Sequence, residues 1–317
     1  MSVVGGIMVP HPPLIVPEVG KGGEKEIAPT SRAYEEAAEF VRDLAPETIV
    51  LTSPHAVMYA DYFHISPGRE GSGDFSRFGA PETGFTVSYD TAFVEELSHR
   101  AALSHFPAGT YGDRMKELDH GTLVPLYFIS RVYPDFDLVR IGLSGESLLD
   151  HYRLGMMIQE TAEKLNRRVV HVGSGDLSHK LKASGPYGFA PEGPVYDERI
   201  MDVMGRAAFS ELLDFPEDLC EKASECGHRS FVMLAGALDQ TEVEIEKLSH
   251  QDVTGVGYGI CTYLVRGENK ERAFLEQWQR REQERRAQKR ASEDAYVRLA
   301  RRSLERYITK KERINWD

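Results

Sequence analysis

Short apolar runs alternate along this chain with longer segments whose apolar residues recur at helical spacing. The apolar runs predict buried strands, and the periodic segments predict amphipathic helices. Strands are predicted at residues 3–9, 48–51, 85–89, 138–143, 169–172 and 256–265. Helices are predicted at residues 30–44 (capped by Thr30 or Ser31), 92–102, 122–132, 148–165, 195–212 and 229–238. The alternation predicts an α/β fold with a central, mostly parallel or mixed sheet and helices on both faces.

Two segments do not fit this alternation. Residues 68–84 are rich in glycine and polar residues, and we expect them to form a surface loop or mobile flap. After Gly267 the chain has no glycine or proline and is dominated by charged helix formers. We therefore expect two domains, an α/β domain over residues 1–267 and a charged helical tail over residues 268–317.

Charge is divided unevenly between these two parts. The formal net charge is −12, but the 15 Lys/Arg and 10 Asp/Glu from Glu268 onward give the tail a net charge of +5. The remaining 23 Lys/Arg and 40 Asp/Glu leave the α/β part at −17. So acidic a surface disfavours nucleic acid as a partner. The mixed signs of the tail are typical of a solvated helix.

Membrane insertion and a disulfide framework are also disfavoured. No apolar run approaches the roughly 18 residues of a membrane span, and the first residues lack the basic start of a signal peptide. Cysteine is present three times, an odd number that disfavours a framework of disulfides. We expect a cytoplasmic protein.

Two histidines follow the first two predicted strands and are braced by prolines. His11 lies in Val-Pro-His-Pro-Pro, and His55 lies in Ser-Pro-His. Proline fixes the backbone φ angle and so lowers the entropic cost of aiming a neighbouring side chain. Ligands of open α/β sheets bind beyond the carboxyl ends of the strands. The two histidines are therefore predicted to bind one divalent metal ion.

Further candidate residues lie where other strands end or helices begin. Asp119 precedes His120 at the start of an apolar helix, where it can cap the helix or orient the imidazole. Asp176 and His179 follow the strand at residues 169–172. A turn before the helix at residues 229–238 offers three candidates for a third metal ligand, which are Glu225, Cys226 and His228.

Five of these motifs, taken in order, resemble those of a known family. They are PHPP, SPH, DHG, GSGDLSHKL and the Glu-Cys-Gly turn. Over roughly residues 3–265 the chain resembles class III extradiol ring-cleavage dioxygenases, such as the catalytic subunit of protocatechuate 4,5-dioxygenase. It resembles most closely the Memo-like branch of the AmmeMemoRadiSam system, and its tail resembles the start of an AMMECR domain.

The resemblance implies a role for each candidate residue. His11, His55 and Glu225 would hold Fe(II), leaving positions open for an aromatic diol and O₂. His179 would be the acid–base residue, and His120 would contact the substrate or its oxygen. The chain would then be an extradiol dioxygenase that cleaves a catechol-type ring.

Cys226 keeps a second interpretation open. Memo-like relatives are similar at this turn but use a cysteine there, and a thiolate favours zinc or copper over Fe(II). The chain would then be a metal-binding protein without ring-cleavage activity. Its partners would be proteins of the AmmeMemoRadiSam system, or further copies of the chain held by the basic tail against the acidic body. Between the two ligands, the similarity to the ring-cleaving branch favours Glu225.

Overall fold

The computed structural model describes residues 2–114 and 117–313. The chain divides into two compact units, Met1–Ala273 and Phe274–Asp317. Within the described residues, none of the helices combines the length and apolar character needed to cross a membrane.

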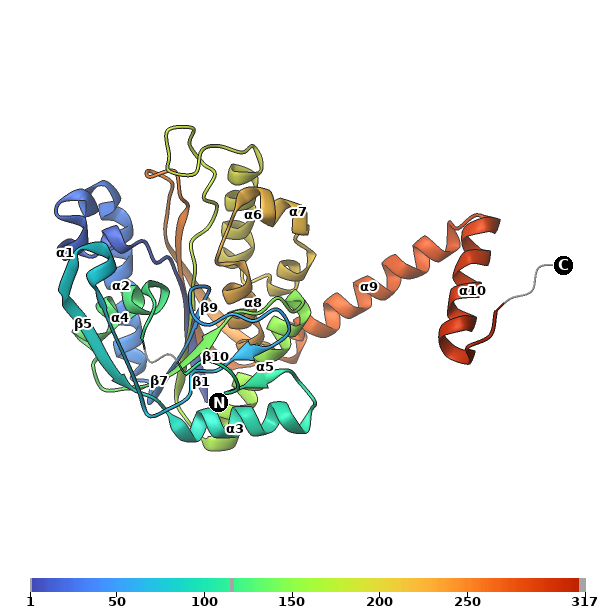
Figure 1. Ribbon diagram of the computed structural model, residues 1–317, viewed down its shortest axis with the longest axis horizontal. Coiled ribbons are helices and arrows are strands. Elements are labelled where there is room, and N and C mark those ends of the chain that lie inside the picture. Colours follow the sequence, from blue (N-terminus) through green and yellow to red (C-terminus); the bar gives the residue numbers. More distant parts are fainter. Residues whose placement is uncertain (1, 115–116, 314–317) are drawn as a thin grey trace. The chain divides into compact units, whose positions relative to one another are not determined.

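A six-stranded sheet forms the centre of the first unit (Figure 1). Its strands are, in spatial order, β7 (Asp137–Gly142), β2 (Thr48–Ser53), β8 (Val169–Ser174), β1 (Val3–Val9), β10 (Tyr258–Glu268) and β9 (Thr241–Gln251). The first four are parallel, and β10 and β9 are antiparallel to their neighbours. Parallel strands are covered on both faces, which explains why β2 and β8 are buried along their whole length.

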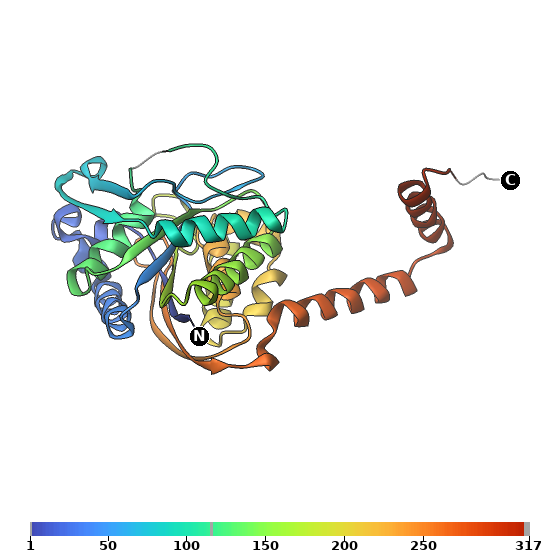
Figure 2. The ribbon, with the colours of Figure 1, turned by 90° about the horizontal axis from the view of Figure 1, so that it is seen from below.

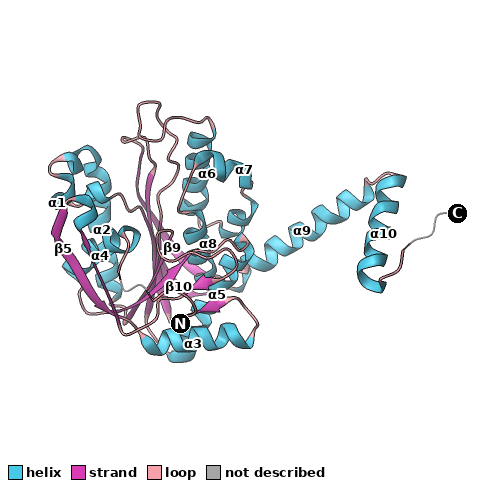
Figure 3. Cartoon of the chain, in the orientation of Figure 1, coloured by secondary structure: helices cyan, strands magenta, loops and turns pink. Residues whose placement is uncertain are grey.

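Helices cover both faces of this sheet, which appears in Figure 3 as magenta strands between layers of cyan helices. On one face lie α2 (Ala28–Leu44) and α4 (His120–Val132). On the other face, α6 (Glu192–Gly205) and α8 (His228–Ala237) contact the strands. Helix α5 (Leu148–Leu165) packs on α8. Beside α5 lies α3 (Thr91–Leu103), teal in Figure 2. The other helices of the first unit are α1 (Pro17–Gly20) and α7 (Glu217–Ala223). Its 3-10 turns are Pro13–Ile15, Gly23–Ile27, Ser76–Phe78, Phe209–Asp214 and Lys270–Arg272. The predicted fold class is confirmed.

The expected loop at residues 68–84 is wrong, because most of it forms a hairpin. Strands β4 (Glu70–Phe75) and β5 (Ala80–Ser88) pair antiparallel. The glycines that predicted a loop instead permit close packing. A Cβ at Gly73 would lie 2.7 Å from the Leu118 carbonyl oxygen, and one at Gly71 would collide with the hydroxyl of Tyr89. A further pair of two-residue strands, β3 (Phe63–His64) and β6 (Ala108–Gly109), pairs in parallel.

Three further differences concern element boundaries. Helix α2 begins at Ala28, so Thr30 does not cap it; Thr30 is buried, and its hydroxyl donates to Gln251 Oε1 at 2.6 Å. Helix α6 ends at Gly205 and is followed by the separate turn Phe209–Asp214, where one helix over residues 195–212 was expected. Strand β9 was not predicted, because charged residues alternate along it as is usual on a sheet edge.

An arginine is buried at the carboxyl end of the sheet. Arg140 on β7 is 1% exposed, its Nη1 donates to the Glu117 carbonyl at 2.8 Å, and its Nε lies 3.5 Å from Asp119 Oδ2. Asp119 caps α4 by accepting from the backbone N–H of Thr122, and it accepts from the hydroxyl of Ser53 at 2.5 Å. One carboxylate therefore ties together β2, β7 and α4.

Asp119 remains ionised in this setting. Burial raises its pKa, but Arg140, followed by the hydrogen bonds from Ser53 and Thr122, outweighs burial and leaves the pKa below 3.8. An ionised carboxylate with these partners stabilises the fold above that pH, and its contribution is lost as the pH falls through the lowered value.

Replacing Arg140 should therefore leave the buried, ionised carboxylate of Asp119 without its positively charged partner. We expect Arg140→Met to lower the free energy of unfolding by about 3–5 kcal/mol at neutral pH, measured by urea denaturation. Surface Arg206, paired with Asp202, provides the matched control Arg206→Met, with an expected loss of about 0–1 kcal/mol. The loss from Arg140→Met should shrink in acid, where Asp119 is protonated. Equal losses for the two variants would contradict this role of Arg140.

The second unit consists of helices α9 (Phe274–Ala291) and α10 (Ala295–Lys310). The predicted charged helical tail is confirmed as a structural element. Strand β10 extends to Glu268, and the second unit begins at Phe274 rather than directly after Gly267. Apart from Phe274, the residues of these two helices are half-buried or exposed.

The exposure of this unit predicts that the α/β unit folds without it. A chain ending at Phe274 should keep its cooperative thermal transition and its metal content, because the sheet, its covering helices and the candidate residues precede this point. The measurements are differential scanning calorimetry and metal analysis beside the full chain. An insoluble or metal-free truncated protein would show that the α/β unit needs α9 and α10.

Candidate functional site

Three neighbouring strands deliver the candidate residues to one edge of the sheet. In the order β2–β8–β1, each strand ends two residues before a polar side chain, namely His55, Asp176 and His11. Because these strands are parallel, their carboxyl ends meet at the same edge. The strand ends therefore place the two proline-braced histidines on either side of the β8 loop.

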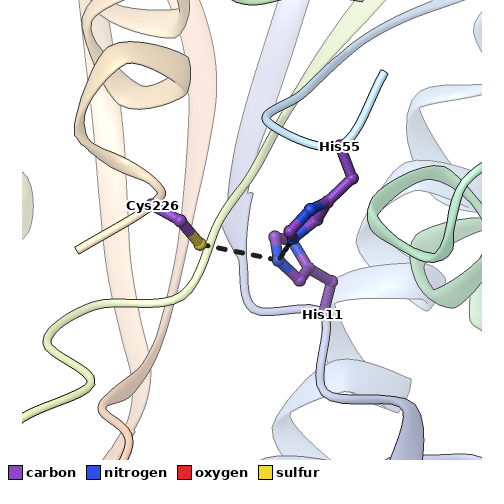
Figure 4. Close-up of side chains that lie close together, drawn as sticks. All are labelled: His11, His55 and Cys226. Atoms are coloured by element: carbon purple, nitrogen blue, oxygen red, sulfur yellow. Dashed lines mark hydrogen bonds between the residues drawn. The ribbon is translucent and has the colours of Figure 1, made fainter. Parts of the chain in front are cut away.

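Two imidazoles and one thiol converge at this edge (Figure 4). His11 Nε2 lies 3.1 Å from His55 Nε2 and 3.6 Å from Cys226 Sγ. All three ligand atoms lie within 4.8 Å of one another. Imidazole nitrogen and thiolate sulfur are the ligands that zinc and copper prefer.

A hydroxyl orients the His11 ring toward this cluster. The hydroxyl of Ser174 donates its single proton to the Gly121 carbonyl at 2.6 Å, so its oxygen must accept from Nδ1–H of His11 at 3.0 Å. Nε2 of His11 is then unprotonated and presents its lone pair to His55 and Cys226. Two nitrogens 3.1 Å apart must have a proton or a cation between them, so the residues present fit a metal ion.

The structure brings Cys226 to the histidines and places Glu225 elsewhere, contrary to the preference drawn from the resemblance. The Glu225 carboxylate accepts from the backbone N–H of His228 at 2.6 Å and lines a different cavity. Burial raises its pKa to about 7. His228 is also directed away, since its ring contacts the Leu212 carbonyl and the hydroxyl of Tyr196.

A backbone contact holds the Cys226 turn against the β8 loop. A Cβ at Gly175 would lie 2.1 Å from the Cα of Gly227. Cys226 Sγ accepts from the backbone N–H of Asp176 at 3.2 Å, and the backbone N–H of Gly227 donates to the Asp176 carbonyl. Only glycine permits this approach, and it determines that Cys226 faces the histidines.

A second group of possible ligands shares the same thiol. Ligand atoms of Asp176, His179 and Cys226 also lie within 4.8 Å of one another. Asp176 does not cap a helix; its Oδ1 accepts from the backbone N–H of His11 at 2.8 Å. Burial raises the pKa of this carboxyl.

The two histidines proposed for catalysis neighbour different members of the cluster, His120 the two imidazoles and His179 the thiol. The His120 ring lies 4.0 Å from the His55 ring between centroids and 5.4 Å from the Phe78 ring. The His179 ring contacts Tyr187 edge-on at 5.0 Å, and its buried Nδ1 has no hydrogen-bond partner within the described residues. The site therefore assembles five of the six predicted residues, His11, His55, His120, His179 and Cys226.

Burial keeps the imidazoles of His11, His55 and His120 neutral. It lowers the pKa of His11 well below 6.5, and the neighbouring His55 and His120 lower it further. Burial also lowers the pKa of His55, and burial followed by His55 lowers that of His120 to about 4. Burial raises the pKa of the Cys226 thiol well above 9. A bound cation would reverse this last effect, because metal coordination deprotonates a thiol.

Sequence reasoning missed the residues that orient the site. Ser174 fixes the His11 ring, and Arg140 holds the carboxylate that binds Ser53. Arg140 was detectable, since a charged residue within a buried apolar strand requires a partner. Ser174 carried no comparable signal, because a serine after a strand is common in turns.

Comparisons with known proteins agree with this architecture. Residues 5–261 match the family described as the catalytic LigB subunit of aromatic ring-opening dioxygenase. Protein CA_C1420 of Clostridium acetobutylicum is 34% identical over 99% of this chain and 68% of its own length. The 2-aminophenol 1,6-dioxygenase beta subunit of a Pseudomonas species is 23% identical over 83% of this chain and 94% of its own.

A solved structure shares the fold. The crystal structure of the uncharacterized protein JW3007 from Escherichia coli K12 aligns with a TM-score of 0.50 at 14% identity, covering 82% of this chain and 99% of that one. The family match extends over most of the chain and spans all five of the residues that converge at the sheet edge. The chain belongs to the family of the catalytic LigB subunit of aromatic ring-opening dioxygenases.

Proposed function

We propose that this protein binds one divalent metal ion through Nε2 of His11, Nε2 of His55 and Sγ of Cys226, as a Memo-like member of the family. The observation that carries the proposal is the thiol of Cys226 beside the two imidazoles, where ring-cleaving relatives would need a carboxylate. Glu225, the carboxylate available in this turn, is held by the backbone of α8.

The ligand set also indicates the metal. A thiolate and two imidazoles form a softer site than two imidazoles and a carboxylate, so zinc or copper should bind in preference to Fe(II). Ser174 supports the site by fixing the tautomer of His11. Such supporting hydrogen bonds raise the basicity of a histidine ligand and hold its ring in place.

Ring cleavage is the second candidate function, and the positions of His120 and His179 favour it. A bound metal would lower the pKa of a hydroxyl of an aromatic diol. His120, neutral because burial lowers its pKa to about 4, is suited to hydrogen-bond the substrate. His179, whose Nδ1 lacks a protein partner in the described part of the chain, is suited to accept the second proton.

The name of one relative suggests that proteins of this kind work in assemblies. The 2-aminophenol 1,6-dioxygenase protein is a subunit by name, and we propose that this chain also works in an assembly. Further copies of itself and AmmeMemoRadiSam-system proteins are the two candidate partners.

The third ligand can be identified with three variants. We expect Cys226→Ala to lose stoichiometric zinc or copper, because it removes the only thiol of the cluster. Glu225→Gln should keep the metal, and so should the control Cys261→Ala, which removes a buried cysteine on β10. The measurements are metal analysis and the thiolate charge-transfer absorbance of the cobalt-substituted protein. Metal retained in Cys226→Ala but lost in Glu225→Gln would overturn the assignment in favour of an iron site.

The unaltered protein and one further variant, His179→Ala, decide between the two functions. Oxygen uptake on a panel of catechols should be absent if the protein is only a metal-binding member of the family. If uptake occurs, His179→Ala should keep its metal and lose about 10²–10⁴-fold in turnover, the usual contribution of general acid–base catalysis. Metal lost from His179→Ala, with the fold intact by circular dichroism, would make His179 a ligand instead.

A further inference from the structure

A second cavity lies on the other side of the turn that carries Cys226. It has a volume of about 620 Å³, and its walls come from the start of α5, from α7 and from the start of α8. Glu225 is part of its lining, whereas His11, His55 and Cys226 are not. Consecutive residues of one turn therefore face two separate sites.

One part of this cavity attracts negative charge. The Arg229 guanidinium lines it, and the buried Nε of Arg229 has no hydrogen-bond partner within the described residues. Helices α5 and α8 both begin at this wall, at Leu148 and His228. The first N–H of α8 already donates to the Glu225 carboxylate. The Arg229 guanidinium, which can bind a carboxylate through paired N–H donors, is therefore the cationic group of this wall.

Another part of the wall carries the opposite charge. Glu146, Glu217 and Glu221 line the cavity, with Glu146 half-buried and the other two exposed at its rim. Within residues 2–114 and 117–313, none of the three lies within 4.0 Å of a basic group, and neither does Arg229 lie within that distance of an acidic group. Both signs of charge therefore face one cavity, where Arg229 also acts on the buried Glu225 carboxyl and lowers its pKa against the larger effect of burial.

The remaining lining is apolar. The ring of Phe215 is 5% exposed, and Leu148 is half-buried beside it. Cys220 lines the same space. A volume of this size is typical of small-molecule sites, which span roughly 300–1,000 Å³.

A ligand with a single charge does not fit this wall. An anion would meet the carboxylates at the rim, and a cation would meet Arg229. We infer that this cavity binds a small zwitterion of the amino-acid class, with its carboxylate on Arg229, its ammonium toward Glu146 and an apolar side chain against Leu148. This inference does not depend on the metal-binding proposal.

Three matched probes test the inference by isothermal titration calorimetry on the full chain. Phenylalanine carries both charges, 3-phenylpropionate lacks the ammonium group, and phenethylamine lacks the carboxylate. Phenylalanine should bind, and each analogue should bind at least about tenfold more weakly, since each leaves one side of the wall unpaired. Equal binding of one analogue would make the cavity a simple anion or cation site, and no phenylalanine binding at low millimolar concentration would overturn the inference.

Two variants locate the binding in this cavity. Arg229→Gln should weaken phenylalanine at least about tenfold and leave phenethylamine unchanged, whereas Arg206→Gln on the surface should change neither. Glu146→Gln, in the loop before α5, should weaken phenylalanine and leave 3-phenylpropionate unchanged; it serves also if Arg229→Gln does not fold. Phenylalanine should still bind to Cys226→Ala. Binding that survives both cavity variants, or that disappears with Cys226, would place the ligand elsewhere and overturn the assignment.

Discussion

The interaction on which the site depends is the buried pair of Arg140 and Asp119. A buried charge costs more than its partner repays unless hydrogen bonds satisfy the rest of it, and here Ser53 and Thr122 do so. The same carboxylate thereby fixes the end of β2, from which His55 follows, and the start of α4, where His120 lies. The relative positions of these two imidazoles are set before any ligand arrives.

Low polarity around the sheet edge gives the site its chemical character. Imidazoles that burial keeps neutral have their lone pairs available over a wider range of pH than exposed histidines. The protonated thiol is the opposite case, because burial opposes its ionisation until a cation is present. Metal binding as proposed would be coupled to release of the Cys226 proton, and the affinity would then depend on pH through the thiol more than through the histidines.

The sequence predicted those parts of the molecule that local patterns determine. His11 and His55 follow apolar strands with clear periodicity, so their meeting at one edge could be deduced from the parallel sheet. The choice between Glu225 and Cys226 could not, because a turn directs consecutive side chains to different sides. Their assignment depends on the contact of Gly227 with Gly175, which lies 52 positions away along the chain. The hairpin at β4 and β5 was missed for a similar reason, since Gly73 serves the packing of Leu118.

The contact between Gly175 and Gly227 has a mechanical consequence. Because neither residue has a side chain, the two backbones touch, and this contact fixes the distance between the loop of Asp176 and the turn of Cys226. A methyl group at Gly175 would push the turn away from the loop. The Cys226 sulfur would then move away from the nitrogens of His11 and His55, although none of these three residues would be altered. In the proposed metal site, the distance between the Cys226 sulfur and the histidine nitrogens, and with it the range of ionic radii that the site would accept, would therefore depend on how closely these two backbones pack.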